Sequence, residues 1–482
     1  MQERSFTLQD QTVFAALSGD YNPLHVDPLA ARRTMFGRAV VHGVHAALWG
    51  LDVWLGGRAE VLALRSLRAT FQGTIGLGEK VGCFVERLPD NHVEIELRVG
   101  DAPVLWMTIQ WASRRDQPPE AFSRRLPERL ACRARSLEEL ATATGTLPLC
   151  FVPEGADVVF PNLRRSLDPN QIAQILATTR LVGMECPGLH SVFSGLDLTF
   201  SDETVDTGEV TYRVTTCDPG LSLVSIEVRG PGMTGILKAF VRPAPRAQPS
   251  IQELRRQIRM GEFRGQRALI IGGSRGLGEV TAKLLAAGGA SVTITYHRGA
   301  DDARRIIEEI DRWGGQAACM SFDVLQPPDD LGEHAAKTIS PTHLYYFATP
   351  HISAGRPGSF SGERFRVFCD YYVTGFLSTV RIVQSLTQDL RAVFYPSSIY
   401  LNEIPPNMAE YAAAKMAGET VARLLEKTTP GLTVHLPRLS RLATDQTATF
   451  LPVTNLDPAP LLLQHLRDLR QRAGTATPAG GS

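Results

Sequence analysis

Apolar and polar residues alternate along four consecutive stretches in the N-terminal part of the chain, residues 64–71, 80–88, 92–99 and 104–111. A period of two is typical of β-strands that have one buried face. Just before these stretches, apolar residues recur at helical spacing across residues 44–55. The pattern therefore predicts one buried helix followed by four strands.

A second region repeats this arrangement. We predict a helix over residues 168–182, with Asp168 as its N-cap and Pro169 at its first position. The strands that follow are predicted at residues 190–200, 208–216, 221–229 and 234–241. Because SLRATF at residues 66–71 corresponds to GLDLTF at residues 195–200, we interpret the second region as an internal repeat of the first.

A different pattern begins at residue 267. The run RALII indicates a buried strand, and the glycine-rich turn over residues 272–278 leads directly into a helix and then into a strand at residues 290–296. Glycines in such a turn let the backbone approach a pyrophosphate at the helix N-terminus, whose dipole favours negative charge. This combination predicts a doubly wound parallel sheet that binds a dinucleotide.

Stretches without periodic apolar residues separate these units. Residues 113–150 are rich in Arg and Pro, residues 243–250 form a proline-rich spacer before a short basic helix at 251–260, and the tail is predicted to be disordered. The predicted organisation is a first unit at 1–112, a linker at 113–150, a second unit at 151–243, a linker at 244–266, the dinucleotide-binding unit at 267–470 and the tail at 471–482.

Composition narrows the classes of partner and compartment. The 482 residues include 50 Lys plus Arg and 50 Asp plus Glu, a balance that gives no electrostatic reason to expect nucleic acid or a membrane surface as the partner. The seven cysteines are scattered and form no CxxC pair, so we predict neither a metal site nor disulfides. With a polar N-terminus and no long apolar run, the chain is expected to be cytoplasmic.

The first candidate chemistry lies in the turn-forming run SGDYNP and the residues after it. Asp20 and His25 lie on backbone that Gly19 and Pro23 should keep out of regular helix. An acid and a base held on one rigid loop can add or remove water across a carbon–carbon double bond. From these two residues alone, a surface turn with an incidental histidine is the alternative interpretation.

The longer string FAALSGDYNPLHVDPLAA, residues 14–31, closely resembles the signature of the MaoC-like (R)-specific enoyl-thioester hydratases and dehydratases, a hot-dog-fold family. The resemblance implies an acyl-thioester substrate and catalytic roles for Asp20 and His25. It also implies that free N–H groups before the 44–55 helix hold an enolate oxygen, and we assign this role to Gly43 because it lacks a side chain that would block the thioester. We interpret His42 and His45 as packing or capping residues.

The repeat region has no such motif before its helix. We therefore expect it to be structural, covering a sheet edge and forming one wall of the acyl site. The fold predicted for the whole chain is an α+β double hot-dog followed by an α/β Rossmann-fold domain.

The second candidate site combines Ser398, Tyr411 and Lys415. Tyr411 and Lys415 are four positions apart in a helical stretch, so they share one face, and the ammonium can stabilise a phenolate. Ser398 can hold the carbonyl oxygen that Tyr411 protonates. Together with the glycine turn, and with Ser398 thirteen positions before Tyr411 (411 minus 398), this region resembles the short-chain dehydrogenases/reductases.

That resemblance implies a nicotinamide cofactor. The strand at residues 290–296 is followed by Arg298 and by no acidic residue, so Arg298 and Arg275 are expected to clamp a 2′-phosphate and NADPH is the predicted cofactor. Asp323 is expected to end the third strand and meet the adenine, with a simple turn residue as the alternative. The predicted cofactor contacts are Gly272, Ser274, Arg275, Gly276, Leu277, Gly278, Arg298, Asp323, Val324, Tyr411 and Lys415.

Two positions depart from that family's pattern. YFATP at residues 346–350 stands where many members have Asn-Ala-Gly, and Tyr372 stands where many have the Asn of a proton relay. An inactive reductase therefore stays open as an alternative.

The predicted function is NADPH-dependent reduction of a 3-ketoacyl thioester, carried by coenzyme A or acyl carrier protein, followed by dehydration to the trans-2-enoyl thioester in fatty-acid or polyketide-type biosynthesis. One alternative is the reverse sequence with NAD in acyl degradation, and another is a non-catalytic acyl-binding scaffold. A homodimer or homotetramer through the reductase domain is the expected assembly. The acyl chain, carrier, direction and pathway stay open at this point.

Overall fold

The computed structural model describes residues 2–58, 60–114, 125–202, 208–326, 339–352, 355, 357–450 and 453–475. The chain divides into two compact units, Met1–Ala244 with Thr449–Val453 and Pro245–Ala448 with Thr454–Ser482. Among the described residues, no helix is both long and apolar enough to cross a membrane.

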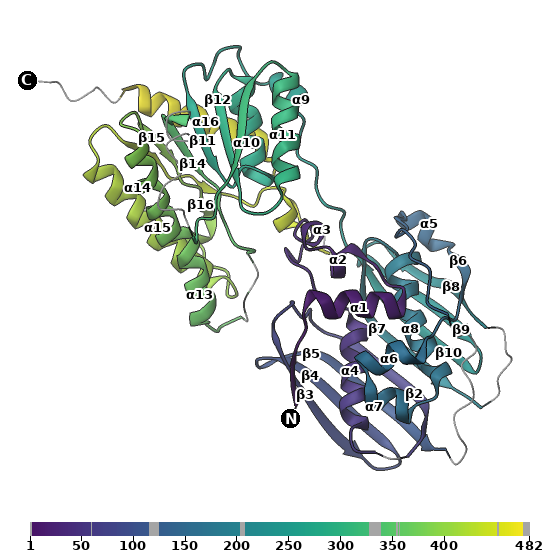
Figure 1. The fold of residues 1–482 in the computed structure, drawn as a ribbon. Helices are drawn as coiled ribbons and strands as arrows, with labels where there is room; N and C mark the ends of the chain where they lie inside the picture. Colours follow the sequence, from purple (N-terminus) through teal and green to yellow (C-terminus); the bar gives the residue numbers. More distant parts are fainter. Residues whose placement is uncertain are drawn as a thin grey trace, which may run out of the picture. The chain divides into compact units, whose positions relative to one another are not determined.

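The described part of the first unit contains one antiparallel sheet of ten strands (Figure 1). Its order is β1-β3-β4-β5-β2-β7-β10-β9-β8-β6. The strands are β1 (Gln2–Ser5), β2 (Leu62–Phe71), β3 (Lys80–Leu88), β4 (His92–Val99), β5 (Ala102–Ser113), β6 (Thr144–Pro148), β7 (Ser191–Phe200), β8 (Glu209–Asp218), β9 (Leu223–Gly230) and β10 (Met233–Val241).

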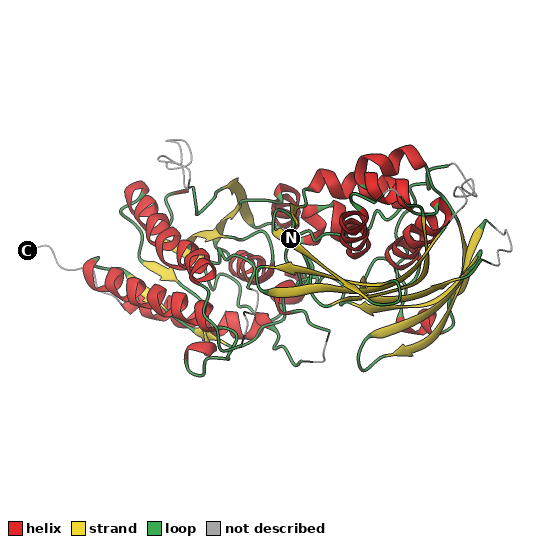
Figure 2. Ribbon diagram, turned by 90° about the horizontal axis from the view of Figure 1, so that it is seen from below, coloured by secondary structure: helices red, strands yellow, loops and turns green. Residues whose placement is uncertain are grey.

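Helices cover one face of this sheet (Figure 2). They are α1 (Leu8–Ser18), α2 (Pro23–Val26), α3 (Pro28–Ala31), α4 (Gly43–Leu55), α5 (Leu137–Ala141), α6 (Pro153–Val159), α7 (Pro161–Ser166), α8 (Pro169–Arg180) and the π-helix η1 (Leu181–Glu185). The long helices α4 and α8 are the two that the apolar periodicity predicts.

The first unit consists of two similar halves, which we call the motif half (residues 2–114) and the repeat half (residues 125–244). Each half has a central helix followed by four antiparallel strands, and the halves join where β2 pairs with β7, with Leu67 opposite Leu198. Both residues are buried in one continuous core. The eight predicted strands are therefore confirmed, and the repeat predicted from SLRATF and GLDLTF forms the seam between the halves.

Local sequence explains how α8 begins. The Asp168 side chain accepts a hydrogen bond from the backbone N–H of Asn170 at 2.9 Å, and Pro169 occupies the first helical position, as predicted. The helix stops short of residue 182 because the backbone changes to the π-helix η1 after Arg180.

The prediction that residues 113–150 are only a linker is wrong for its second half. Residues 115–124 lie outside the described residues, but α5 and the edge strand β6 follow them. β6 pairs with β8, and Leu140 and Leu147 are buried. The Arg- and Pro-rich composition hid this strand, which covers the outer edge of β8.

The second unit is built on a parallel sheet of order β13-β12-β11-β14-β15-β17 (Figure 1). This order reverses direction between β11 and β14, as in a doubly wound fold. Its strands are β11 (Arg267–Ile271), β12 (Ser291–Tyr296), β13 (Gln316–Ser321), β14 (His343–Tyr346), β15 (Ala392–Phe394) and β17 (Thr433–His435), and β16 (Ser397–Ser398) pairs separately with β18 (Arg438–Leu439).

Helices surround this sheet. They are α9 (Ile251–Arg255), α10 (Gly276–Ala287), α11 (Ala300–Arg312), α13 (Gly362–Cys369), the π-helix η2 (Asp370–Gly375), α14 (Phe376–Leu386), η3 (Ile399–Leu401), α15 (Ala409–Thr428), η4 (Asp445–Thr447) and α16 (Pro458–Thr475).

Two predicted boundaries need correction. In the predicted linker 244–266, α9 is shorter than expected, and Ile251, Leu254 and Phe263 are buried in the core of the second unit, so this segment packs as part of that unit. The predicted tail begins inside α16, which continues to Thr475 because Leu466 and Leu469 anchor it in the same core. Residues 476–482 lie outside the described residues.

Candidate functional site

Asp20 is buried at the end of α1. Gly19 closes that helix in a left-handed conformation (φ 79°), which turns the chain sharply toward the core. The carboxylate of Asp20 accepts two hydrogen bonds, from the backbone N–H of Asn22 to Oδ1 at 3.1 Å and from the Thr179 hydroxyl to Oδ2 at 2.6 Å. Burial nevertheless raises the pKa of Asp20 above its usual value.

His25 lies on one short helical turn, α2, which corrects the expectation that no helix forms here. The Asn22 side chain caps this turn by accepting from the Leu24 N–H at 3.1 Å, and Pro23 takes its first position. His25 Nδ1 lies 2.8 Å from the carbonyl oxygen of Val40, so Nδ1–H donates and Nε2 keeps its lone pair. Burial lowers the pKa of His25 to about 3, so the imidazole is neutral.

His42 packs against Asp20 and His25, as expected of a packing residue. Its ring stacks on that of His25 with centroids 3.9 Å apart, and its Nε2 donates to the backbone carbonyl of Asp20 at 3.0 Å. The side-chain oxygen of Gln11 accepts from the His42 backbone N–H at 3.0 Å. These contacts tie the start of α4 to Asp20. His45 is buried with its ring stacked on Phe14 at 4.6 Å.

Gly43 is the first residue of α4, where backbone N–H groups have no partner within the helix. A Cβ at this position would lie 2.9 Å from the Phe71 ring, so no side chain fits. Gly43 and Phe71 both line the cavity described below, so the N-terminus of α4 lies at its wall, a geometry suited to a developing oxyanion.

Asp20, His25 and Gly43 all line one cavity of about 310 Å³. Its walls are largely apolar and come from both halves: Val41, Phe71 and Val104 from the motif half, and Val182, Phe193 and Phe240 from the repeat half. An apolar pocket of this size with a few convergent polar groups is typical of a small-molecule site. The repeat half therefore forms one wall of the cavity, as its predicted role requires.

The glycine-rich loop of the second unit follows β11 and runs into α10. A Cβ at Gly273 would lie 2.6 Å from Ile294, and one at Gly278 would overlap the Gly272 carbonyl oxygen. Gly272 has φ 75°, in the left-handed region that favours glycine. The loop consequently packs tightly under the N-terminus of α10, a cradle that fits a pyrophosphate.

The other predicted cofactor residues gather at the same edge of the sheet. Ser274, Arg275, Gly276 and Leu277 belong to this loop and the first turn of α10, and Arg298 follows β12. Asp323 and Val324 lie just beyond β13, so Asp323 does not end the strand as expected. Asp323 Oδ1 accepts from the Leu325 N–H at 3.0 Å, the bond of a turn residue, and also lies 3.6 Å from His297 Nδ1.

Tyr411 and Lys415 both belong to α15, four residues apart, and the side chain of Ser398, which ends β16, is close enough to the Tyr411 phenol to lower its pKa. Burial raises the pKa of Tyr411 to about 12 and lowers that of Lys415 to about 7. The Lys415 ammonium donates to the Pro396 carbonyl at 2.7 Å. The structure thus brings together the three residues that the sequence proposed for this site.

Two tyrosines complete the surroundings of Lys415. Its Nζ lies 3.9 Å from the Tyr372 ring centroid and 4.8 Å from that of Tyr395, within cation–π range. The Tyr395 hydroxyl donates to the Tyr372 carbonyl at 3.0 Å, and the Tyr372 hydroxyl lies 2.5 Å from Thr349 Oγ1. The two positions that departed from the family pattern are therefore in direct contact. The contact of Tyr395 with Lys415 was not predicted from the sequence, although Tyr395 lies only two residues before the Ser397-Ser398 pair.

Thr179 is the functional residue of the first unit that the sequence did not reveal. It lies on α8 of the repeat half, 159 residues from its partner Asp20, and no motif surrounds it. Nothing short of the packed structure indicates this contact.

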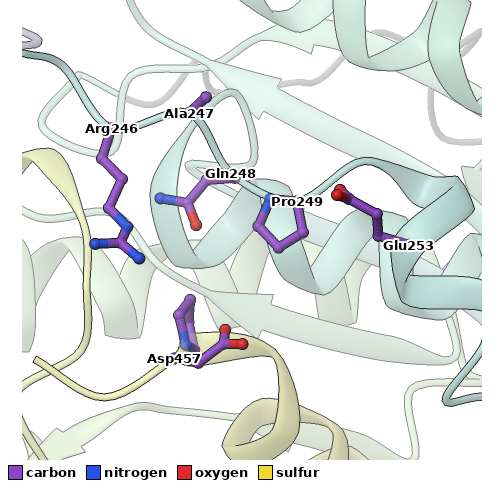
Figure 3. Close-up of a pocket in the computed structure, with 7 residues that line it drawn as sticks. Arg246, Ala247, Gln248, Pro249, Glu253 and Asp457 are labelled. Atoms are coloured by element: carbon purple, nitrogen blue, oxygen red, sulfur yellow. The ribbon is translucent and has the colours of Figure 1, made fainter.

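Two other features hold none of the predicted site residues. One is a pocket in the second unit, between the segment that was predicted to be a linker and the start of α16 (Figure 3). Prolines and polar side chains line it, among them Arg246, Gln248, Glu253 and Asp457. In the described part of that unit, His435, His465 and Asp468 also place potential metal-ligating atoms within 4.8 Å of one another. Two of them already bond each other, His435 Nε2 to His465 Nδ1 at 3.2 Å.

Comparisons with known proteins cover both units. Residues 1–104 match the family described as MaoC like domain, and residues 266–436 match short chain dehydrogenase. An (R)-specific enoyl-CoA hydratase from Aeromonas caviae is 37% identical over 86 residues, which are 17% of this chain and 63% of that protein. A 3-oxoacyl-[acyl-carrier-protein] reductase from Synechocystis sp. is 26% identical over 215 residues, covering 42% of this chain and 82% of that protein.

Among solved structures, a short chain dehydrogenase from Burkholderia cenocepacia in complex with NADP is similar, with 26% identity and a TM-score of 0.33 over 38% of this chain and 78% of that chain. The family matches fall on the two units that carry the sites described above. The chain therefore fuses an N-terminal MaoC-like dehydratase domain to a C-terminal short-chain dehydrogenase/reductase domain.

Proposed function

We propose that this protein reduces a 3-ketoacyl thioester with NADPH and then dehydrates the (3R)-hydroxyacyl thioester to the trans-2-enoyl thioester. The observation that carries the proposal is that Asp20, His25 and Gly43 line one cavity, in a chain that also assembles Ser398, Tyr411 and Lys415. The names of the relatives from Aeromonas and Synechocystis support the same two reactions on thioesters.

Dehydration needs a base for the α-proton and an acid for the leaving hydroxyl. His25 is neutral with a free Nε2, so it removes the α-proton. Asp20, whose pKa burial raises, donates a proton to the hydroxyl, and the C–O bond breaks to release water. The N–H of Gly43 stabilises the enolate oxygen that forms between the two events.

Reduction uses the residues of the second unit. The glycine-rich loop and Arg298 would hold a nicotinamide cofactor, which when bound would be the source of the hydride for the carbonyl carbon. Tyr411 donates its proton to the carbonyl oxygen, Ser398 orients that oxygen, and the Lys415 ammonium stabilises the resulting phenolate. NADPH is favoured over NADH because the two residues that follow β12 are His297 and Arg298, and neither is a carboxylate.

The decisive experiment assays both reactions in one protein. Purified enzyme should consume NADPH with acetoacetyl thioester and should interconvert crotonyl and 3-hydroxybutyryl thioesters. We expect Asp20→Asn to lower only the second reaction and Tyr411→Phe only the first, each by about a hundred- to ten-thousandfold. Normal dehydration by Asp20→Asn would disprove the site, and a preference for NAD with the hydroxyacyl substrate would favour the reverse sequence.

A further inference from the structure

The repeat half supplies contacts to the Asp20 carboxyl group and its loop. The Thr179 hydroxyl donates to Asp20 Oδ2 at 2.6 Å, and Thr179 is 4% exposed. The carbonyl oxygen of Gly183 accepts from the side-chain amide of Asn22 at 2.9 Å. A Cβ at Gly183 would overlap the Asp20 carboxyl group, so this position leaves the space that the acid occupies.

These contacts determine which way the acid faces. One oxygen of Asp20 accepts a hydrogen bond from the Asn22 N–H of the loop itself. The other, Oδ2, accepts its one hydrogen bond among the described residues from Thr179, with His42 Nε2 farther away at 3.9 Å. Without the Thr179 hydroxyl, the carboxyl group could rotate about its bond to Cβ. A hydrogen bond in a buried site is also strong enough to change the pKa of the acceptor.

We propose that Thr179 is a positioning residue for dehydration, through which the half that lacks the catalytic motif orients Asp20 toward the substrate. The inference rests on the proposed function of the MaoC-like site. It gives the repeat half a part in the reaction beyond covering an edge of the sheet.

The test compares Thr179→Val with Thr179→Ser and with Thr178→Val in the full chain. Thr178 is a matched control because it lies next on α8, is equally buried, and donates to the Ile175 carbonyl instead of to Asp20. We expect Thr179→Val to lower kcat of dehydration about 10- to 100-fold with little change in KM, and both other variants to stay near wild type. Thr179→Ala is the replacement if Thr179→Val does not fold.

A structural role alone would not change the pH profile. Losing a donor to the ionised carboxylate raises its pKa further, so the limb of the kcat profile that reports Asp20 should move to higher pH in Thr179→Val. The inference would be overturned if Thr179→Val kept activity within threefold of wild type or if its pH profile did not shift. It would also be overturned if Thr178→Val lost as much activity as Thr179→Val. A carbon-13 NMR titration compares the pKa of the Asp20 carboxyl in wild type and Thr179→Val without any turnover. If the wild type were inactive, the proposed function would be wrong, but this titration would still test the contact between Thr179 and Asp20.

A second, independent observation concerns Arg242, the residue after β10. It is 4% exposed, and its Nη2 donates to the Leu189 carbonyl at 2.7 Å. Its Nε and Nη1 are buried without a hydrogen-bond partner among the described residues. Burial lowers the pKa of Arg242, and the titratable neighbour that raises it is the thiol of Cys132, not a carboxylate. A buried guanidinium with two unsatisfied donors is costly unless an anion binds it.

Arg242 lies beside the cavity of the first unit. The Leu189 carbonyl that it contacts also lies 3.4 Å from the side-chain amide of Asn22 in the catalytic loop. Phe240, near the end of the strand that leads into Arg242, lines the cavity, as does Ser191. Its charge also lowers the pKa of His25.

We propose that Arg242 forms an oxyanion subsite for the thioester substrate. Two parts of such a substrate can supply the anion: a phosphate of the pantetheine arm, or a carboxylate on the acyl chain. Like the first inference, this one rests on the proposed function and extends it to the recognition of the substrate.

Calorimetric titrations of the full chain distinguish the two sources. The first pair of ligands is coenzyme A and pantetheine, and the second is the N-acetylcysteamine thioesters of glutaconate and crotonate. We expect wild type to favour the oxyanion-bearing member of one pair by about tenfold or more, and Arg242→Gln to lose that preference. Arg229→Gln, on the exposed side of β9, is the surface control. No preference in wild type, or a preference that survives Arg242→Gln, would overturn the proposal.

Discussion

At the residue scale, burial shifts the pKa values in both sites. It raises the pKa of Asp20 and lowers that of His25 to about 3, so in both groups burial favours the uncharged form. In the second unit burial lowers the pKa of Lys415 to about 7. The same residues on an exposed loop or helix would keep their ordinary values and would be much poorer proton donors and acceptors near neutral pH.

Reduction should therefore lose rate as pH rises through about 7, because Lys415 then becomes neutral and no longer stabilises the Tyr411 phenolate. The same depressed pKa affects stability. Between about pH 7 and pH 10.5 the Lys415 amine is neutral in the folded state but protonated in the unfolded state, so its contribution to the free energy of unfolding rises with pH in this range. NADPH consumption measured from pH 5 to 9 checks the rate. Lys415→Met should reduce the substrate more slowly and should show no loss of rate around pH 7. If the loss of rate near pH 7 persists in this variant, a group other than Lys415 causes it.

The aromatic ring of Tyr372, and not its hydroxyl, should hold the Lys415 ammonium in position for reduction. A cation–π contact in a buried site contributes about 0.5–2 kcal/mol, which is about 2- to 30-fold in rate if it positions the ammonium. We expect Tyr372→Phe to reduce ketoacyl thioester at nearly the wild-type rate and Tyr372→Ala to lose about that factor in kcat. Equal losses in both variants would instead assign the effect to the bond with Thr349.

At the element scale, contacts between helices of the two halves support the site. Asp52 of α4 caps α7 of the repeat half, where its Oδ1 accepts from the backbone N–H groups of Asn162 and Leu163, both at 2.8 Å. Gln171 of α8 bonds both backbone groups of Leu64 in β2, each at 2.9 Å. These side-chain bonds join helices and strands that the seam between β2 and β7 brings together.

Removing the Asp52 cap should lower the free energy of unfolding of the first unit by about 1–3 kcal/mol, since two buried N–H groups lose their acceptor. Asp52→Asn keeps an acceptor oxygen and should cost less than Asp52→Ala. Urea unfolding of the full chain measures the change, with exposed Asp101→Ala as a control. A loss as large in Asp101→Ala would show that the effect is not specific to the cap.

At the scale of the whole molecule, the two reactions belong to units with separate cores. One hydrophobic core spans both halves of the first unit, and the described residues of the second unit form their own cores on the two sides of the parallel sheet. Each site therefore has its own supporting packing, and a substitution in one site should leave the other intact.

A mixture of Asp20→Asn and Tyr411→Phe proteins should accordingly convert a ketoacyl thioester to the enoyl thioester, because each chain supplies the site that the other lacks. Asp20→Asn alone should stop at the hydroxyacyl thioester, and Tyr411→Phe alone should leave the ketoacyl thioester unreduced. Product analysis by chromatography after incubation with NADPH checks this. If the mixture accumulates only the hydroxyacyl thioester although each variant performs its own step alone, the two steps require both sites in one chain.

Much of this protein was predictable from sequence because the relevant signals are local. Alternating residues predicted β3 and β4 at their observed bounds, and the cap at Asp168 predicted where α8 begins. The strand β6 was missed because five residues with Gly and Pro at an edge carry no alternating pattern, and α16 was cut short because its last turns resemble a polar tail.

The sequence by itself determined the two kinds of domain and the residues proposed for acid–base chemistry, since these depend on periodicity and on motifs whose members lie within a few turns of one another. Only the tertiary structure decided how those residues work. The contact of Thr179 with Asp20 spans 159 positions, and the ring of Tyr372 meets Lys415 through the packing of η2 against α15. Such contacts and the burial that sets each pKa arise from packing between distant segments, for which no local pattern exists.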